Sequence, residues 1–240
     1  MKLRSWLVQR VAVNVAITDY VKARQALPRT EVIYHGIEDL SKAPRKVTME
    51  VSPIIKPVIV YVGRFVREKG ISALLHGAKL LAAEGQDFEL RLIGDGSLRS
   101  EIEEEVARLG LQRCVTITGF LAGNGLDLAI EGAAAVVMPS VWEEAAGLAA
   151  IEQMMRGKLV VASAIGGLQE VLGDAGITFP AGDARALADR LRTVLQNPGL
   201  GRQLGEKARV RATMFFGRQR MIEEHAKVYR RLLIRGEGSK

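Results

Sequence analysis

The sequence contains a single cysteine among 240 residues, so it can form neither an intrachain disulfide framework nor a cysteine zinc site. Cys114 lies in the apolar run CVTIT, which predicts a buried thiol and fits a reducing compartment. Histidine is equally scarce: His35, His76 and His225 share no metal-ligand spacing and accompany no Ser or Cys nucleophile. No D-x-D motif occurs either, so the sequence indicates no metal site.

Aromatic residues make up only 5% of the chain although 48% of it is hydrophobic, which predicts the aliphatic core of an α/β protein. No uninterrupted apolar run approaches the roughly 18 residues of a membrane span. The N-terminal run MKLRSWLVQRVAVNVAI carries Arg10 within its apolar part, so we interpret it as part of the fold and not as a signal peptide. We therefore expect a cytoplasmic protein, peripheral to a membrane at most.

The net charge of +7 points to an anionic partner, yet the basic residues are spread along the whole chain. The sequence has no dense basic cluster and no zinc-finger or RNA-binding signature, so no nucleic-acid partner is predicted. An anionic membrane surface fits the charge better, and a merely solvated basic surface is the simpler alternative.

From residue 57 onward, short apolar runs alternate with helical patterns, which predicts a Rossmann-like α/β domain with a parallel sheet of about six strands flanked by helices. The expected strands are 58–62, 89–93, 115–118, 135–138, 159–162 and 177–179. The expected helices are 70–83, 98–109, 125–132, 147–156, 167–172, 184–196, 200–213 and 217–234. In such sheets, ligands bind outside the carboxyl ends of the strands.

The first part of the chain predicts a smaller unit. Residues 1–38 should form a helix, a strand at 11–17, a helix at 20–26 capped by Thr18 or Asp19, and a strand at 31–34. The polar stretch with Pro44 and Pro53 has little periodicity and is typical of an interdomain linker. We therefore divide the chain into 1–38, a linker at 39–56, a domain at 57–214, and a C-terminal helix and tail at 215–240.

The loop after the first strand of the domain carries the first candidate residues, Gly63, Arg64 and Lys69. Gly63 allows the backbone to approach a ligand closely, while arginine offers a planar fork and lysine a mobile point charge, both suited to a diphosphate. The structural alternative is a solvated basic loop that Glu68 partly neutralises.

The loop after the fourth strand leads into a helix near Gly147, whose N-terminus carries the second set of candidates. The N–H groups of Gly147, Leu148 and Ala149 would lack intrahelical partners, and with the helix dipole they favour phosphate. Glu144 and Glu152 place a carboxylate on either side of this seat. Carboxylates do not bind phosphate, so they must serve hydroxyl groups, which points to a nucleotide sugar. The alternative is ordinary helix stabilisation by Glu, worth about 0.3–1 kcal/mol.

Two further strand ends carry weaker signals. Gly94 opens a G-D-G turn, but Arg99 stands where a dinucleotide fingerprint needs Gly or Ala, so no nicotinamide site is predicted. A tight structural turn is a sufficient explanation there. Phe120 follows the third strand, where it could contact a ligand or be a buried ring that covers the sheet end.

In their order along the chain, G-R-x-x-x-x-K-G, G-D-G, E-x7-E and G-G-x-x-E resemble the donor site of retaining glycosyltransferases of family 4, which have the two-domain GT-B fold. The resemblance covers about residues 11–235. It implies that residues 57–214 are the C-terminal donor-binding half of that fold. Residues 1–38 would be a remnant of the acceptor domain, and 215–240 a crossover helix and tail.

The resemblance also implies roles for the candidate residues. Arg64 and Lys69 would hold the leaving diphosphate, Glu144 the sugar hydroxyls and Glu152 the ribose, while Glu170 would have a local structural role. Contacts with the donor are further implied for Gly63, Gly94, Phe120, Gly147, Leu148 and Ala149.

Two functions remain open at this stage. The first is transfer from a nucleotide-diphosphate sugar to a glycan or lipid-linked acceptor, with no cofactor and no metal. The second is a nucleotide-sugar-binding module without catalysis of its own, which needs a partner chain that supplies the acceptor domain. Ala145-Ala146 and Gln153 depart from the family pattern and leave the sugar open. A basic nucleic-acid-binding domain is a third class, but no base-reading feature supports it.

Overall fold

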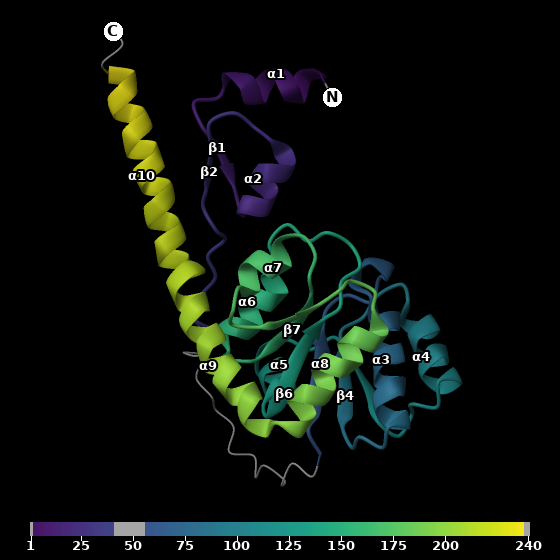
Figure 1. Cartoon of the computed structure of the whole chain (residues 1–240). Helices are drawn as coiled ribbons and strands as arrows, with labels where there is room; N and C mark the ends of the chain where they lie inside the picture. The colour runs from purple at the N-terminus through teal and green to yellow at the C-terminus, as the bar shows by residue number, and fades with distance from the viewer. Residues whose placement is uncertain (1, 41–55, 238–240) are drawn as a thin grey trace.

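The computed structural model describes residues 2–40 and 56–237. Its main element is a six-stranded parallel sheet with the strand order β5-β4-β3-β6-β7-β8 (Figure 1). The strands are β3 (Val58–Val62), β4 (Glu89–Ile93), β5 (Val115–Gly119), β6 (Ala133–Met138), β7 (Val160–Ser163) and β8 (Ile177–Phe179). The predicted Rossmann-like sheet is therefore confirmed, with strand ends displaced by no more than two residues.

Helices follow the strands in the order that the periodicity predicts. They are the 3-10 turn η2 (Arg67–Lys69), α3 (Ile71–Ala83), α4 (Arg99–Arg108), α5 (Gly123–Ile130), α6 (Leu148–Met155), α7 (Gly167–Leu172), α8 (Ala184–Gln196), α9 (Pro198–Phe215) and α10 (Arg218–Glu237). Each crossover helix covers one face of the sheet, as parallel strands require.

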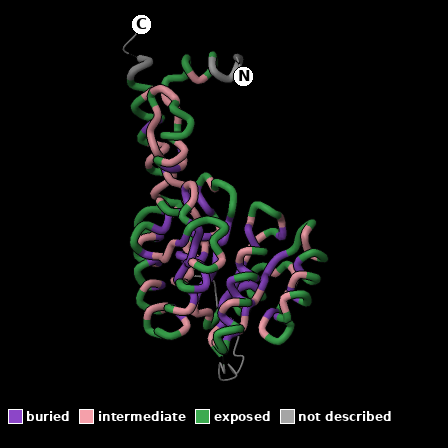
Figure 2. Tube along the Cα trace, turned by 45° about the vertical axis from the view of Figure 1, so that its right-hand side comes forward, coloured by how far each residue is buried: buried purple, intermediate pink, exposed green. Residues whose placement is uncertain are grey.

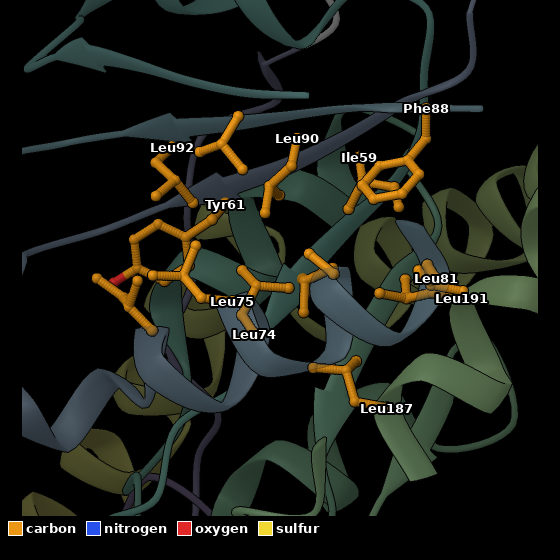
Figure 3. Close-up of a cluster of buried hydrophobic side chains, with 14 of the residues drawn as sticks. Ile59, Tyr61, Leu74, Leu75, Leu81, Phe88, Leu90, Leu92, Leu187 and Leu191 are labelled. Carbon is orange, nitrogen blue, oxygen red and sulfur yellow. The ribbon is translucent and has the colours of Figure 1, made fainter. Parts of the chain in front are cut away.

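The sheet is buried on both faces because successive strand residues point to opposite sides. On one face, Ile59 and Tyr61 of β3 pack with leucines of β4 against α3 and α8 (Figure 3). On the other face, Val58 and Val60 belong to a second cluster that includes α6, α7 and α9. Burying one such side chain fully stabilises the fold by about 1.5–3 kcal/mol, so the two clusters hold the strand ends rigidly.

The N-terminal unit, residues 2–40, comprises α1 (Lys2–Arg10), β1 (Asn14–Ala16), α2 (Asp19–Gln25) and β2 (Thr30–Val32). Strands β1 and β2 pair in parallel through α2, so they form a separate β-α-β unit. Thr18 caps α2 by accepting a hydrogen bond from the Val21 N–H at 3.1 Å, which confirms one of the two expected caps. The predicted linker falls almost entirely on residues 41–55, which lie outside the described residues.

Helix α10 leaves the sheet and runs alongside the N-terminal unit (Figure 1). Arg220 Nη2 donates to the Tyr34 carbonyl at 2.7 Å, and the Tyr34 ring meets Phe216 edge-on at 5.4 Å between centroids. Further along α10, Arg231 forms an ion pair with Glu31. These contacts join the two ends of the described chain.

Much of the N-terminal unit and α10 remains exposed, in contrast to the densely buried sheet (Figure 2). Exposed apolar side chains lie on or just after α1, on β1 and on α10; they are Trp6, Leu7, Val11, Val15, Ile222, Tyr229, Leu233 and Ile234. A groove of about 520 Å³ lies between β1, β2 and α10. No described helix has both the length and the apolarity needed to span a bilayer.

Cys114 departs from its expected environment. It is half-buried directly before β5, where its thiol lies 3.4 Å from the Leu111 carbonyl oxygen, so the thiol is less buried than predicted. Partial burial still raises the pKa of the Cys114 thiol, which disfavours the thiolate.

The loops after β3 and β4 pack backbone against backbone at Gly94. The φ of Gly94 is +146°, and a Cβ added there would lie 1.8 Å from the Gly63 carbonyl oxygen. Its N–H donates to the Gly119 carbonyl at 2.9 Å, so three strand ends meet at this residue. Any side chain at this position would push the loop of β3 away from that of β4.

Replacing Gly94 by Ala should lower the free energy of unfolding by about 3 kcal/mol or more, because backbone strain and overpacking add together. Urea denaturation measures this change. Gly85→Ala is the matched control: Gly85 also has a positive φ of 75°, but no atom lies within 4 Å of an added Cβ. The control should lose only about 1–2 kcal/mol. Equal losses in the two variants would contradict the close-approach explanation.

Candidate functional site

A cavity of about 200 Å³ opens at the carboxyl ends of β3 and β6. These two strands are neighbours, but the chain continues from β3 to β4 and β5 on one side and from β6 to β7 and β8 on the other. Such a reversal of strand order is where parallel α/β sheets bind ligands. The residues that line the cavity include Gly63, Arg64, Lys69, Pro139, Ser140, Glu144, Gly147, Ala149 and Ala150.

Lys69 and Glu144 meet across this cavity. Gly70 allows the approach, since its φ is +66° and a Cβ there would lie 2.0 Å from the Pro139 carbonyl oxygen. Lys69 Nζ lies 2.5 Å from Glu144 Oε1, and the Ser140 hydroxyl donates to the same oxygen at 2.5 Å. A cation and a carboxylate, 27% and 22% exposed, are therefore held together at the cavity wall.

The N-terminus of α6 faces the same cavity. Gly147 is its N-cap with a φ of 58°, and no side chain caps the helix. Among the described residues, no acceptor takes the N–H groups of Gly147, Leu148 or Ala149. The predicted helix start is confirmed to within one residue, and it leaves three backbone donors at the positive end of the helix dipole.

Arg64 is exposed at the rim of the cavity, and a hydrogen bond from a buried side chain fixes its backbone. The hydroxyl of the buried Tyr61 donates to the Arg64 carbonyl at 2.8 Å. Burial raises the pKa of Tyr61, so this hydroxyl stays protonated and remains a donor.

Four of the predicted site residues do not line the cavity: Gly94, Phe120, Glu152 and Leu148, which is exposed at the first position of α6. Gly94 lies behind it, where its close contact with Gly63 shapes the loop. Phe120 is 77% exposed at the end of β5, so the alternative of a buried ring that covers the sheet end is wrong. Glu152 lies on the second turn of α6, half-buried beside the cavity.

Burial raises the pKa of Glu152, and the positive charge of Arg156 partly offsets this effect. Arg156 is itself held by Asp127, with Nε 3.0 Å from Oδ1. In the described part of the chain no side chain donates a hydrogen bond to the Glu152 carboxylate. Its acceptor oxygens are therefore available to hydroxyl groups of a ligand.

Two contacts could not be expected from the motifs. Ser140 lies two residues after the end of β6 and donates a hydrogen bond to Glu144; its only sequence signal is the Pro-Ser pair at the strand end. Glu170 makes no merely local contact: its carboxylate accepts the backbone N–H groups of Asp19 and Tyr20 in the N-terminal unit. The expected local role of Glu170 is therefore wrong.

Metal binding was not expected, and among the described residues no group of three His, Cys, Asp or Glu side chains could hold an ion. This finding covers only the described residues, so the expectation of a metal-free site stays a prediction.

A family model described as glycosyl transferases group 1 matches residues 48–211, more than half of the chain. The chain belongs to this family. The α-D-kanosaminyltransferase of Streptomyces kanamyceticus is 32% identical over 155 residues, which are 64% of this chain and 40% of that protein. The MMP α-(1→4)-mannosyltransferase of Mycolicibacterium hassiacum is 28% identical over 95% of this chain and 54% of that protein. The group 1 chain thus spans about half the length of the curated relatives it matches.

Solved structures agree with the GT-B fold of a group 1 glycosyltransferase. The sucrose-phosphate synthase of Thermosynechococcus elongatus superposes with a TM-score of 0.82 at 27% identity, over 97% of this chain and 61% of that chain. The Anabaena protein HepE, in complex with UDP and glucose, gives a TM-score of 0.80 at 20% identity, over 95% of this chain and 66% of that one.

Glu152→Gln should make the fold more stable at about pH 7, because burial penalises the charged carboxylate and the amide removes that penalty. The raised pKa means that the folded state binds more protons than the unfolded state, whose Glu pKa is about 4.3. Stability of the wild type therefore falls as the pH rises through the folded pKa, and the variant lacks this fall. Thermal melts at about pH 4 and pH 7 should show the gain only at the higher pH.

The matched control for this prediction is Glu104→Gln on the exposed face of α4. It should change the melting temperature little at either pH, because an exposed charge is screened by solvent. A gain from Glu152→Gln that is equal at both pH values would contradict an origin in ionisation.

Proposed function

We propose that this group 1 chain is the donor-binding half of a retaining family 4 glycosyltransferase, which transfers a sugar from a nucleotide-diphosphate sugar to an acceptor hydroxyl. The observation that carries this proposal is the convergence of Lys69, Glu144 and the start of α6 on one cavity at the β3–β6 reversal. Cationic donors and carboxylate acceptors meet there, as a ligand with both phosphates and hydroxyls requires.

Each residue has a role that its position supports. Arg64 and Lys69 would stabilise the departing diphosphate together with the N–H groups of α6, which are preorganised at the cavity wall. Glu144 would accept the hydroxyls of the donor sugar, and Glu152 those of the ribose. No metal ion is then needed, since side-chain cations and the helix N-terminus supply the positive charge.

The small volume of the cavity supports a bound donor that lies partly inside the cavity and partly outside it. About 200 Å³ is less than the roughly 300–1,000 Å³ of sites that enclose a drug-sized ligand, so the cavity can hold only the diphosphate and part of the sugar. The base would then lie along the open sheet edge toward Phe120. The complex of Anabaena HepE with UDP and glucose supports this class of donor for the present chain.

The N-terminal unit would be the end of an acceptor domain, with α10 as the helix that crosses back onto it. The contacts of α10 with residues 31–37 support this assignment. The acceptor would be a glycan or a lipid-linked sugar. The net charge of +7 would favour binding of the chain to an anionic membrane surface, where a lipid-linked acceptor would lie.

A second function is supported by the exposed apolar side chains on α1, β1 and α10. Patches of this kind mark contact surfaces, and a partner polypeptide that supplies the rest of an acceptor domain would cover them. The chain alone would then bind the nucleotide sugar without turning it over. Donor hydrolysis or transfer by the purified chain favours the first function, and binding without turnover favours the second.

Calorimetric titration with UDP, GDP and ADP should show binding of one nucleotide. Arg64→Ala, Lys69→Ala and Glu152→Ala should each weaken that binding by about tenfold or more, because each removes a hydrogen bond to or from a charged group. The result would also identify the base.

Arg113→Ala is the control. Arg113 is exposed before β5, at the amino ends of the strands, whereas the cavity lies at their carboxyl ends. The affinity of this variant should match that of the wild type. A folded wild-type chain that binds none of the three nucleotides would overturn the donor site, as would an equal loss in the Arg113 variant.

A further inference from the structure

The N-terminus of α2 is capped from two different parts of the chain. Thr18 Oγ1 accepts the N–H of Val21 at 3.1 Å, as an N-cap residue commonly does. The two oxygens of Glu170 accept the N–H groups of Asp19 and Tyr20, each at 2.8 Å. All three donors of the first turn are therefore satisfied, two of them by a carboxylate about 150 residues away in the sequence.

The same end of α2 also holds the loop between β6 and α6. Thr18 is fully buried, and its hydroxyl donates to the Ala145 carbonyl at 2.8 Å. The preceding carbonyl, that of Glu144, accepts the Gly167 N–H at 2.6 Å from the start of α7. Two consecutive carbonyls of the loop are thus fixed, one by the N-terminal unit and one by α7.

Helix α7 is a firm support for these contacts because α9 holds its other end. Arg211 of α9 donates through Nε to the Val171 carbonyl at 2.8 Å and through Nη2 to the Glu170 carbonyl at 2.7 Å. Tyr34 also lies near Glu170: burial and then the Glu170 carboxylate raise its pKa to about 12. These contacts form a closed ring of α7, α2 and the β6–α6 loop, and α9 holds α7 from outside this ring through Arg211.

We propose that Thr18 and Glu170 are positioning residues: by docking α2 onto α7, they hold the β6–α6 loop so that Glu144 faces the donor sugar. This inference rests on the proposed function, since it concerns the same site. The described residues that line the cavity include none from the N-terminal unit, so this unit acts on the site only through the loop.

These contacts do more than cap α2, because they also restrain the loop that carries Glu144. The Glu144 carbonyl accepts a hydrogen bond from α7, and its side chain accepts hydrogen bonds from Lys69 and Ser140. The loop can therefore move little while the Ala145 carbonyl keeps its own hydrogen bond. Released from Thr18, Ala145 is an exposed residue with nothing else to fix its carbonyl among the described contacts. A displacement of about 1 Å at a reacting group can cost about a hundredfold in rate, so such a restraint has functional weight.

Hydrogen exchange measured on the full chain tests this proposal without any ligand. Thr18→Val removes both hydrogen bonds at nearly constant shape, and Glu170→Gln removes the charge and one strong acceptor. Each variant should speed exchange of the Gly167 amide, which donates to the Glu144 carbonyl at 2.6 Å, by about five- to tenfold, the loss expected for about one hydrogen bond. Thr18→Ser keeps the hydroxyl and should restore slow exchange.

Asp183→Ala is the matched control, because it removes the N-cap of α8, where Asp183 Oδ1 accepts the Ala186 N–H at 2.8 Å. It should lower overall stability to a similar extent without speeding exchange of the Gly167 amide. Exchange of this amide that is no faster in the Thr18 and Glu170 variants than in this control would overturn the positioning role. If Thr18→Val does not fold, Glu170→Gln decides the question by the same criterion.

Calorimetry with UDP, GDP and ADP on the same proteins separates this inference from the proposed function. A wild-type chain that binds no nucleotide contradicts the donor site, whatever the exchange rates are. Unchanged exchange in the variants contradicts the positioning role, even where a nucleotide binds.

Discussion

The reversal of strand order between β3 and β6 is the constraint on which the rest of the site depends. Connections that leave two adjacent parallel strands toward opposite edges cannot cover the junction, so a gap opens at their carboxyl ends. The loop after β3 brings Arg64 and Lys69 to this gap, and the loop after β6 brings Glu144 and the start of α6. Gly70 lets these two loops touch, because no side chain separates it from the Pro139 carbonyl.

Within the gap, opposite charges are balanced at short range. Lys69 and Ser140 donate to one oxygen of Glu144, so a half-buried carboxylate and a half-buried ammonium compensate each other. The start of α6 adds positive charge that belongs to the backbone. Binding a ligand there therefore costs no side-chain rotamer entropy. A proposed donor with phosphates between two polyols matches this order of charges.

The N-terminal unit and α10 extend this arrangement beyond the sheet. Thr18 and Glu170 tie α2 to the loop of Glu144 and to α7, and Arg220 ties α10 to Tyr34. The group 1 sheet therefore does not stand apart from its neighbours, and Tyr34, Ile37 and Leu40 of the N-terminal unit pack against its second core cluster. The apolar side chains left exposed on α1, β1 and α10 are those that the proposed partner polypeptide would cover.

Most of the fold could be predicted because its signals are local. Apolar runs of three to five residues between helical periods specify buried strands, and each predicted strand of the six-stranded sheet lies within two residues of its place. The spacing of Glu144 and Glu152 around Gly147 likewise placed Glu144 before α6 and Glu152 on its second turn. The predictions for Cys114 and for a buried Phe120 failed because burial depends on what packs over a strand end, which periodicity does not encode.

By itself, the sequence determined the order of strands and helices, the loops that carry the candidate residues, and the start of α6. Only the tertiary structure decided that Lys69 pairs with Glu144 and Ser140, and that Glu170 reaches α2 instead of its own surroundings. The reason is that local propensity acts over a few residues, whereas these contacts join segments up to about 150 residues apart. Their geometry follows from the way the packed sheet brings distant loops together.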